Sequence, residues 1–324
     1  MGEYGKLMKP TISVITLTYK NYSKLYETIK SVLEQDYPNI EYIISDDGSG
    51  DFPYDEVQDY LEKNKRDNVS YKIIVNEINT GTVKNFNNAI ISSSGEYIFP
   101  LSCNDIFISK DVVSKIERVF SKTSCKMVIT SRVKYVDNKP VNVIPHVGDR
   151  ENIKKLDDKY KKYRALMLTE HYGMFIGCNV YYDRKTLEKY NLFDEKYRLL
   201  EDLPILEKFL WNEEVELRPE IVSILYDGAT GVTLKSNKVH PLLEKDINRF
   251  NKFGKTAHYK ELDRKTRRHI DFGIKRSKAK SKVQLLIACI VYSPRIISYL
   301  AFCTKRWMAG KNDKKYLSNI DNLK

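Results

Sequence analysis

Over the first hundred residues, hydrophobic positions follow two different periods in turn. Four apolar stretches rich in β-branched and aromatic residues are typical of buried strands, and the apolar residues between them recur at helical spacing. Leu25, Ile29 and Val32, for example, lie on one face of a helix. The pattern predicts strands at 11–18, 40–45, 71–75 and 97–101, with helices around 25–33, 54–65 and 83–92.

Alternating strands and helices predict a parallel sheet that helices cover on both faces. Ligands of such sheets bind beyond the carboxyl ends of the strands. Polar clusters stand at these ends: Thr18 and Tyr19 after the first strand, Asp46 and Asp47 after the second, and residues 102–105 after the fourth. This coincidence predicts a binding site at that edge of the sheet.

The pattern changes after the fourth strand. Residues 132–168 are charged and irregular, and we expect them to form a mobile connection or an insertion that faces the acceptor. Further on, the sequence predicts a strand at 174–182, a helix at 203–211 and a strand at 215–224.

Composition places the chain among ordinary globular proteins. Of its 324 residues 42% are hydrophobic and 30% charged, which excludes collagen, mucin-like stalks and general disorder. The five cysteines contain no C-x-x-C pair, which argues against a disulfide framework or a zinc site. Residues 1–10 hold no apolar run of the secretory type. We therefore expect a reducing, cytoplasmic location.

Positive charge is concentrated at one end of the chain. Residues 249–324 contain 20 Lys and Arg against 5 Asp and Glu, a net charge of +15, whereas the whole chain carries +12. This asymmetry predicts an anionic partner, either nucleic acid or an anionic membrane surface. Few aromatic residues interleave the basic stretch, so we expect no nucleic-acid binding.

Short motifs follow one another in a fixed order along residues 11–235. They are Ser13-Val14-Ile15 with Thr18-Tyr19, Ser45-Asp46-Asp47-Gly48-Ser49, residues 79–87, Gly95-Glu96-Tyr97-Ile98, Phe193-Asp194-Glu195-Lys196-Tyr197 and Leu200-Glu201-Asp202. Together they resemble the motifs of inverting family-2 glycosyltransferases with the GT-A fold. The resemblance implies an α/β nucleotide-binding domain at 1–248, with a mixed sheet and flanking helices, and a basic helical extension at 249–324.

The resemblance also implies roles at the donor site. Leu17, Thr18 and Tyr19 would hold the base of a nucleotide, Tyr19 by stacking, while Asp46 accepts a base N–H and Asp47 lines the same site. Judged from the residues alone, the two aspartates are equally typical of a turn that follows a strand.

The resemblance places Lys84 near the donor diphosphate, whose negative charge must be stabilised when it leaves. A solvated lysine on a helix face is the alternative. Residues 102–105 depart from the family, whose members show two acidic residues where this chain has Asn104 and Asp105. Asp105 is the implied ligand of Mg²⁺ or Mn²⁺, and the Asn104 carbonyl would bind ribose or ligate the ion weakly.

Asp202 is the implied catalytic base, and Glu201 the implied acceptor-side residue. A carboxylate close to the reaction centre suits removal of the proton from an acceptor hydroxyl. The alternative is that either residue only caps the following helix. The glycine-containing segment 226–233 resembles a family loop, although a plain turn explains it equally well.

An apolar run at 283–302 is interrupted by Pro294 and Arg295. Because basic residues flank it on both sides, we expect two short helices that lie in the headgroup region of an anionic membrane, with contacts through residues 249–310. A helical pair packed on the catalytic domain is the alternative.

The expected function is transfer of a hexose from a UDP-linked donor to a glycan or lipid-linked acceptor, as in capsule or lipopolysaccharide-type assembly at the inner face of the cell membrane. Two other functions stay open. One is a non-catalytic scaffold that binds nucleotide sugars, in which Asn104 marks the loss of an acidic residue that the family uses. The other is a sugar nucleotidyltransferase, for which residues 16–21 lack the usual glycine-rich basic loop.

Overall fold

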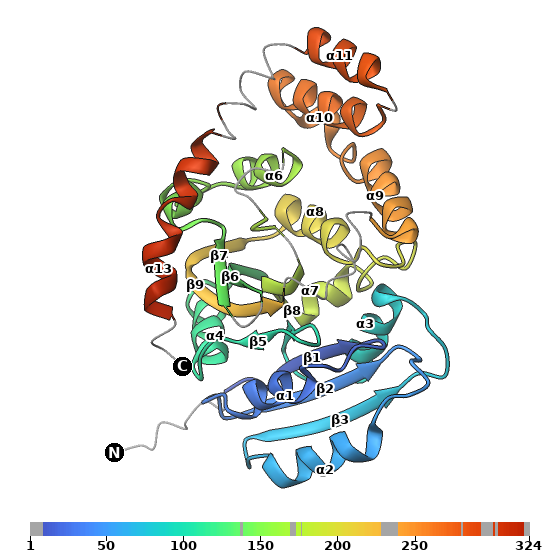
Figure 1. Cartoon of the computed structure of the whole chain (residues 1–324), viewed down its shortest axis with the longest axis vertical. Coiled ribbons are helices and arrows are strands. Elements are labelled where there is room, and N and C mark those ends of the chain that lie inside the picture. Colours follow the sequence, from blue (N-terminus) through green and yellow to red (C-terminus); the bar gives the residue numbers. More distant parts are fainter. Residues whose placement is uncertain are drawn as a thin grey trace. The chain divides into compact units, whose positions relative to one another are not determined.

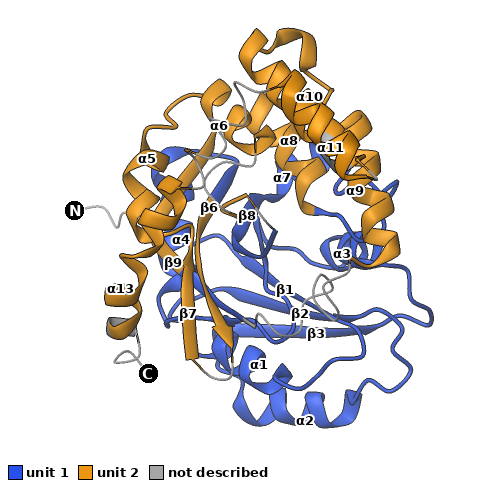
Figure 2. Cartoon of the chain, turned by 45° about the horizontal axis from the view of Figure 1, so that its top comes forward, with its two compact units in different colours: residues 1–128, 177–201, 223–226 blue, residues 129–176, 202–222, 227–324 orange. Residues whose placement is uncertain are grey.

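The computed structural model describes residues 9–136, 139–168, 173–175, 177–227, 239–279, 281–292, 301 and 304–320. The chain divides into two compact units, and both are assembled from separate stretches of sequence (Figure 2). The first unit comprises residues 1–128, 177–201 and 223–226, and the second comprises 129–176, 202–222 and 227–324.

The first unit is built on a sheet whose strand order is β3-β2-β1-β4-β8. The strands are β1 (Ile12–Thr18), β2 (Ile40–Asp46), β3 (Val69–Val75), β4 (Tyr97–Pro100) and β8 (Val180–Asp183). The first four run parallel, and β8 pairs antiparallel with β4. The first three strands lie side by side in Figure 1. In this register Thr18 of β1 lies opposite Asp46 of β2.

The first unit has five α-helices among its described residues, of which the sequence predicts the first three. They are α1 (Leu25–Leu33), α2 (Tyr54–Asn64), α3 (Thr82–Ile91), α4 (Val112–Thr123) and α7 (Arg184–Lys189). Leu25, Ile29 and Val32 of α1 are fully buried with Val14 and Phe99 of the sheet. The strands and helices expected over the first hundred residues are therefore confirmed, with ends that shift by one or two residues.

The second unit contains an antiparallel strand pair with a third strand beside it. Strand β6 (Met127–Val136) enters it from the first unit and pairs with β7 (Lys139–Ile144), and β9 (Val215–Asp227) neighbours β6. The last residues of β9 return to the first unit, where they pair with β5 (Ile106–Phe107).

The helices of the second unit are α5 (Arg150–Lys154), α6 (Lys159–Met167), α8 (Asp202–Asn212), α9 (Pro241–Phe253), α10 (Arg264–Ser277), α11 (Lys282–Val291) and α13 (Asp313–Ile320). Short 3₁₀ turns lie at Val147–Asp149 and Tyr259–Glu261 in this unit, and at Gly177–Asn179 in the first. Within the described part of the chain, none of these helices is both long enough and apolar enough to span a bilayer.

The irregular structure expected for residues 132–168 is wrong, because much of this region is regular, whereas its expected position facing the acceptor stays a prediction. The region holds the second half of β6, all of β7, and helices α5 and α6. Strand β6 was not predicted because it contains charged residues, which are typical of exposed positions. Arg132 is nevertheless only 4% exposed. The strand expected at 174–182 begins only at Val180, after the 3₁₀ turn at Gly177–Asn179. The helix expected at 203–211 and the strand expected at 215–224 are confirmed.

The expected domain boundary between residues 248 and 249 falls inside α9. The helical character of the C-terminal region is confirmed by α10, α11 and α13. The division into a catalytic part and a basic extension stays a prediction.

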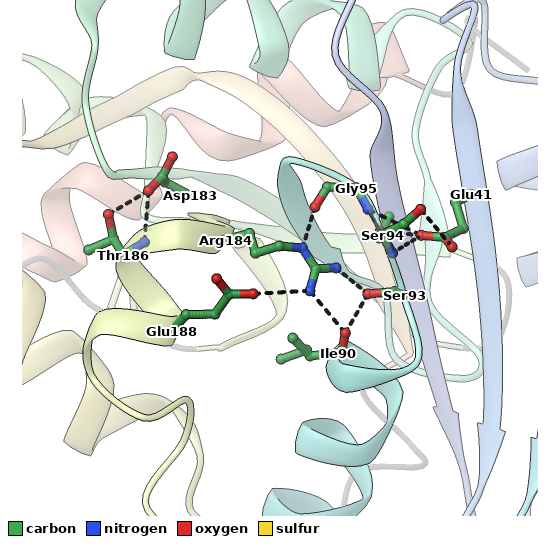
Figure 3. A network of polar contacts seen from close by, with 10 residues as sticks. Glu41, Ile90, Ser93, Ser94, Gly95, Asp183, Arg184, Thr186 and Glu188 are labelled. Carbon is green, nitrogen blue, oxygen red and sulfur yellow. Dashed lines mark hydrogen bonds and ion pairs between the residues drawn. The ribbon is translucent and has the colours of Figure 1, made fainter.

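A mostly buried arginine fixes the turn between α3 and β4 in the first unit (Figure 3). The Arg184 guanidinium donates to the carbonyl oxygens of Gly95 and Ile90 and to the Ser93 hydroxyl, and its side chain is 13% exposed. The Glu41 carboxylate accepts the Ser94 backbone N–H at 2.7 Å from the opposite side of the same turn. These contacts hold the start of β4, and with it the segment that follows β4.

We expect Arg184→Ala to lower the free energy of unfolding by about 2–4 kcal/mol, because it removes the arginine donor of the Gly95 carbonyl and the packing of a mostly buried side chain. Lys185→Ala is the matched control, since that lysine is exposed on the same helix. Its effect should stay within about 0.5 kcal/mol. Urea unfolding of both variants measures the difference. Equal losses in the free energy of unfolding would show that the Arg184 hydrogen bonds add no stability.

Candidate functional site

Thr18 and Asp46 meet at the carboxyl edge of the first unit's sheet. Because β1 and β2 are neighbouring parallel strands, their last residues lie opposite each other. The Thr18 hydroxyl donates to Oδ1 of Asp46 at 2.8 Å, and Asp46 is fully buried. The structure thus brings together two residues that the sequence assigned to the donor site.

Asp46 accepts further hydrogen bonds from residues that the sequence analysis did not single out. Oδ1 accepts from the Ser49 hydroxyl at 2.6 Å and from the Tyr22 hydroxyl at 3.2 Å, and Oδ2 accepts the Ser49 backbone N–H at 2.8 Å. Burial, together with the negative charge of Asp46, raises the pKa of Tyr22 to about 12. The phenol therefore remains protonated, and able to donate, at neutral pH.

Asp47 fixes the loop that precedes α3. Its Oδ1 accepts from the backbone N–H and the hydroxyl of Thr80, at 2.8 and 2.9 Å, and its Oδ2 accepts the Gly81 N–H at 2.8 Å. These bonds make Asp47 a positioning residue. Its expected contact with the donor stays a prediction.

The same loop is held from its other side by Arg198, which the sequence analysis also missed. Its guanidinium donates to the Asn79 side-chain oxygen at 2.8 Å, and its backbone carbonyl accepts the Val83 N–H at 3.2 Å. Gly81 has a φ of +93°, and a Cβ there would lie 2.5 Å from Cγ of Arg198. Only glycine fits so close an approach at this backbone angle.

The aromatic ring expected to stack on a base is accessible. Tyr19 is 47% exposed, and Nζ of Lys20 lies 5.4 Å from its ring centroid. Leu17 is partly buried beside it in the chain, and Lys84 is exposed on the first turn of α3. Stacking on an exposed phenol face leaves its hydroxyl in water, which suits a nucleotide base.

Asn104 has a structural role at the segment that follows β4. Its φ of +76° lies in the left-handed region, where asparagine is better tolerated than most residues. Its side-chain oxygen accepts the Lys24 N–H at 2.8 Å, and its backbone N–H donates to the Thr28 hydroxyl at 3.1 Å. Asn104 thereby joins residues 102–105 to the start of α1.

Asp105 is 7% exposed, and its backbone N–H donates to the Ser102 carbonyl at 3.0 Å. Burial, reinforced by the Asp105 charge, raises the pKa of the neighbouring Cys103 thiol to about 12. A protonated thiol is a poor metal ligand. Among the residues that the structure describes, no cluster of three or more His, Cys, Asp or Glu side chains is arranged to hold a metal ion.

The expected catalytic base lies at the start of α8, in the second unit. Asp202 is 8% exposed, and its Oδ1 accepts the Leu203 N–H at 2.7 Å. A carboxylate in this position interacts favourably with the helix dipole. Glu201 precedes it and is the last residue of its stretch in the first unit. Of the expected loop at 226–233, residues 228–233 lie outside the described part of the chain.

A buried polar cluster anchors α8 within the second unit. Glu207 accepts from the Tyr163 hydroxyl at 3.1 Å, and Nε2 of His258 lies 3.3 Å from the same oxygen. The His258 ring stacks on Trp211 with centroids 4.0 Å apart. Burial raises the pKa of Glu207 above its ordinary value. The sequence indicates no role for any histidine, and the contacts of His258 with Glu207 and Trp211 are visible only in the folded structure.

Comparisons with known proteins show the family and the fold of this chain. The model of the family described as "Glycosyl transferase family 2" matches residues 13–191. The putative teichuronic acid biosynthesis glycosyltransferase TuaG of Bacillus subtilis is 34% identical over 122 residues, which cover 38% of this chain and 46% of TuaG. The putative colanic acid biosynthesis glycosyl transferase WcaA of Escherichia coli is 36% identical over 96 residues, which cover 30% of this chain and 33% of WcaA. The chain thus spans less than half the length of either relative.

Among solved structures, S. aureus TarS 1–349 in complex with UDP-GlcNAc matches with a TM-score of 0.55 and 17% identity, over 83% of this chain and 82% of that one. The mannosyltransferase PcManGT from Pyrobaculum calidifontis, in complex with GDP-Man and Mn²⁺, matches with a TM-score of 0.53 and 14% identity. The match covers 97% of this chain and 87% of PcManGT. At these identities the likeness shows the fold, and the expected GT-A architecture is confirmed.

Proposed function

The chain belongs to glycosyl transferase family 2, and on that premise we propose that it transfers a sugar from a nucleoside-diphosphate sugar to a glycan or lipid-linked acceptor of a cell-surface polysaccharide. The observation that carries the proposal is the buried Asp46 carboxylate, which accepts hydrogen bonds from Thr18 and Ser49, with the exposed Tyr19 next to Thr18 in the chain. The names of TuaG and WcaA support the polysaccharide context. The nucleotide sugars bound by TarS and PcManGT support the donor class.

The donor base is recognised by Tyr19 and Asp46. The exposed phenol face of Tyr19 stacks on the base. Oδ2 of Asp46, which accepts the Ser49 N–H, has capacity for a second donor. Because Asp46 is fully buried, an N–H of the base reaches this oxygen only when the residues that cover it move aside. Thr18, Tyr22 and Ser49 keep this carboxylate in one orientation before any ligand arrives.

Asp105 suits a hard divalent cation such as Mg²⁺ or Mn²⁺. Such an ion is commonly held by one or two carboxylates together with substrate phosphates, so the lack of a larger acidic cluster among the described residues does not conflict with it. When bound, the ion neutralises charge on the departing diphosphate. Lys84, exposed on α3, adds a second positive charge on the donor side. The Asn104 oxygen, which accepts the Lys24 N–H, supports the loop that carries Asp105.

Asp202 takes the proton of the acceptor hydroxyl as that hydroxyl attacks the anomeric carbon, and Glu201 contacts the acceptor. Direct attack on the face opposite the leaving diphosphate inverts the anomeric configuration. Because the Leu203 N–H fixes one oxygen of Asp202, the other oxygen is oriented without further reorganisation.

The test is nucleotide release from a panel of UDP-, GDP- and dTDP-sugars, with Mn²⁺ or with excess chelator, and with membrane lipid extract as acceptor. We expect release from a UDP-sugar, and a fall of at least about 100-fold with chelator because the diphosphate charge is no longer neutralised. Equal release in both conditions would exclude the metal role. Nucleotide binding without release from any donor would favour a scaffold, and pyrophosphate formation from a sugar phosphate and a nucleoside triphosphate would favour a nucleotidyltransferase.

A further inference from the structure

Helix α11 is apolar and yet largely exposed. Val283, Leu286 and Ile290 are between 60% and 66% exposed, although large aliphatic side chains are normally buried. Only Ala288 and Tyr292 are buried among the described residues from 281 to 292. An exposed apolar surface of this kind marks a place where something else binds.

One narrow face of α11 is already used, because it packs on α10. Phe272 of α10 contacts Tyr292, with ring centroids 5.8 Å apart, and Ala288 and Cys289 complete this small core. Both views show the two helices side by side within the second unit (Figures 1 and 2). The pair therefore has a core of its own, which leaves the remaining surface of α11 facing outward.

The charge around this surface indicates what it binds. A hollow of about 280 Å³ lies between the two helices, and Lys275 and Lys278 line it together with Ile287 and Val291. Nζ of Lys275 lies 5.8 Å from the centroid of the Tyr292 ring. Further exposed basic residues of the pair are Arg264, Lys265, Arg268 and Lys282. Ammonium groups thus stand beside exposed aliphatic side chains, which is the combination found in segments that lie at a membrane surface.

We propose that α10 and α11 form a docking surface for an anionic phospholipid bilayer. The aliphatic side chains of α11 enter the boundary between headgroups and acyl chains, and Lys275 and Lys278 contact lipid phosphates. A protein partner would need an acidic rim to match these lysines, whereas an anionic bilayer supplies apolar and negative layers at every point. The proposal goes beyond the glycosyl transfer proposed above, and either one can fail without the other.

The test is co-sedimentation of the full chain, without donor, with vesicles of phosphatidylcholine alone or with about 30% phosphatidylglycerol. Leu286→Ser with Ile290→Ser removes aliphatic contact, and Lys275→Gln with Lys278→Gln removes charge. Ile91→Ser is the apolar control, since Ile91 is 70% exposed on α3, and Lys63→Gln on α2 is the basic control, since that side chain is 76% exposed.

We expect the anionic vesicles to bind at least about tenfold more tightly than the neutral ones, with a loss of affinity as salt rises. The lysine pair should weaken binding about 25-fold, at about fivefold for each lysine. The aliphatic pair should weaken it about 30-fold, and both controls should match the wild type. Because all four target side chains are exposed, unfolding transitions should be unchanged.

Three results would overturn the proposal. The first is equal affinity for neutral and anionic vesicles. The second is a loss in the controls as large as that in the test variants. The third is a wild-type dimer that the aliphatic pair converts to monomer while vesicle binding is unaffected, which would assign the surface of α11 to a second copy of the chain.

Discussion

Asp202→Asn is expected to reduce sugar transfer by about 10³-fold or more and to leave donor binding nearly unchanged. General-base catalysis contributes about 10²–10⁴ to such rates, and an amide has no basic oxygen to receive the proton. The asparagine carbonyl can still accept the Leu203 N–H that Oδ1 of Asp202 accepts, so the start of α8 is preserved. The loss therefore belongs to the chemical step and not to folding.

Glu201→Gln is the matched control for this variant, because it removes a neighbouring carboxylate that is not assigned to proton transfer. We expect it to raise KM for the acceptor and to keep kcat within about tenfold of the wild type. Rates from single-turnover transfer and donor affinity from calorimetry separate the two variants. Near-normal turnover in Asp202→Asn would refute the assignment of the base.

Asp46→Ala is expected to have the second largest effect, on both stability and donor binding. The substitution leaves the buried Thr18 hydroxyl and Ser49 N–H without the acceptor that they share, whereas the Tyr22 hydroxyl keeps its 3.4 Å contact with Asp51. Each buried donor left unpaired costs about 1–3 kcal/mol, so we expect a loss of about 3–5 kcal/mol in the free energy of unfolding. Nucleotide affinity should fall at least about 100-fold, because the base loses its acceptor.

Two further variants separate these effects. Asp46→Asn keeps one acceptor oxygen, and it should recover part of the stability while binding nucleotide weakly. Asp55→Ala removes an exposed carboxylate on α2 and should change stability by no more than about 0.5 kcal/mol. Urea unfolding and nucleotide titration of the three proteins give the comparison. A loss in Asp46→Ala no larger than that in Asp55→Ala would contradict a stabilising role for the network.

The first half of the GT-A fold was predictable because β1 and β2, at the centre of its parallel strands, are buried along almost their whole length. Such strands read as continuous apolar runs, and the helices between them repeat every three to four residues. Strand β6 escaped prediction because it buries Arg132, whose charge is typical of an exposed position. Strand β7 pairs with it and was missed for a related reason, since Lys139 and Asn142 give this strand a polar appearance.

The candidate site was predictable where strand register determines it, and not where distant side chains do. Thr18 and Asp46 meet because β1 and β2 end together. Asp47, in contrast, bonds to Thr80, 33 residues further along the chain, and Arg198 bonds to Asn79, 119 residues earlier. Periodicity carries no signal for such pairs. The role of Asn104 also depends on a backbone angle that only the folded loop defines.

The discontinuity of the two units has a consequence for how the protein is made. The first unit is complete only when residues 177–201 and 223–226 have joined residues 1–128. A nascent chain that has just released residue 128 therefore carries β4 without the antiparallel partner that β8 later supplies. An unpaired edge strand of this kind favours association with other chains. We therefore expect chains truncated before β8 to associate more readily than the whole chain, because β4 then lacks its antiparallel partner.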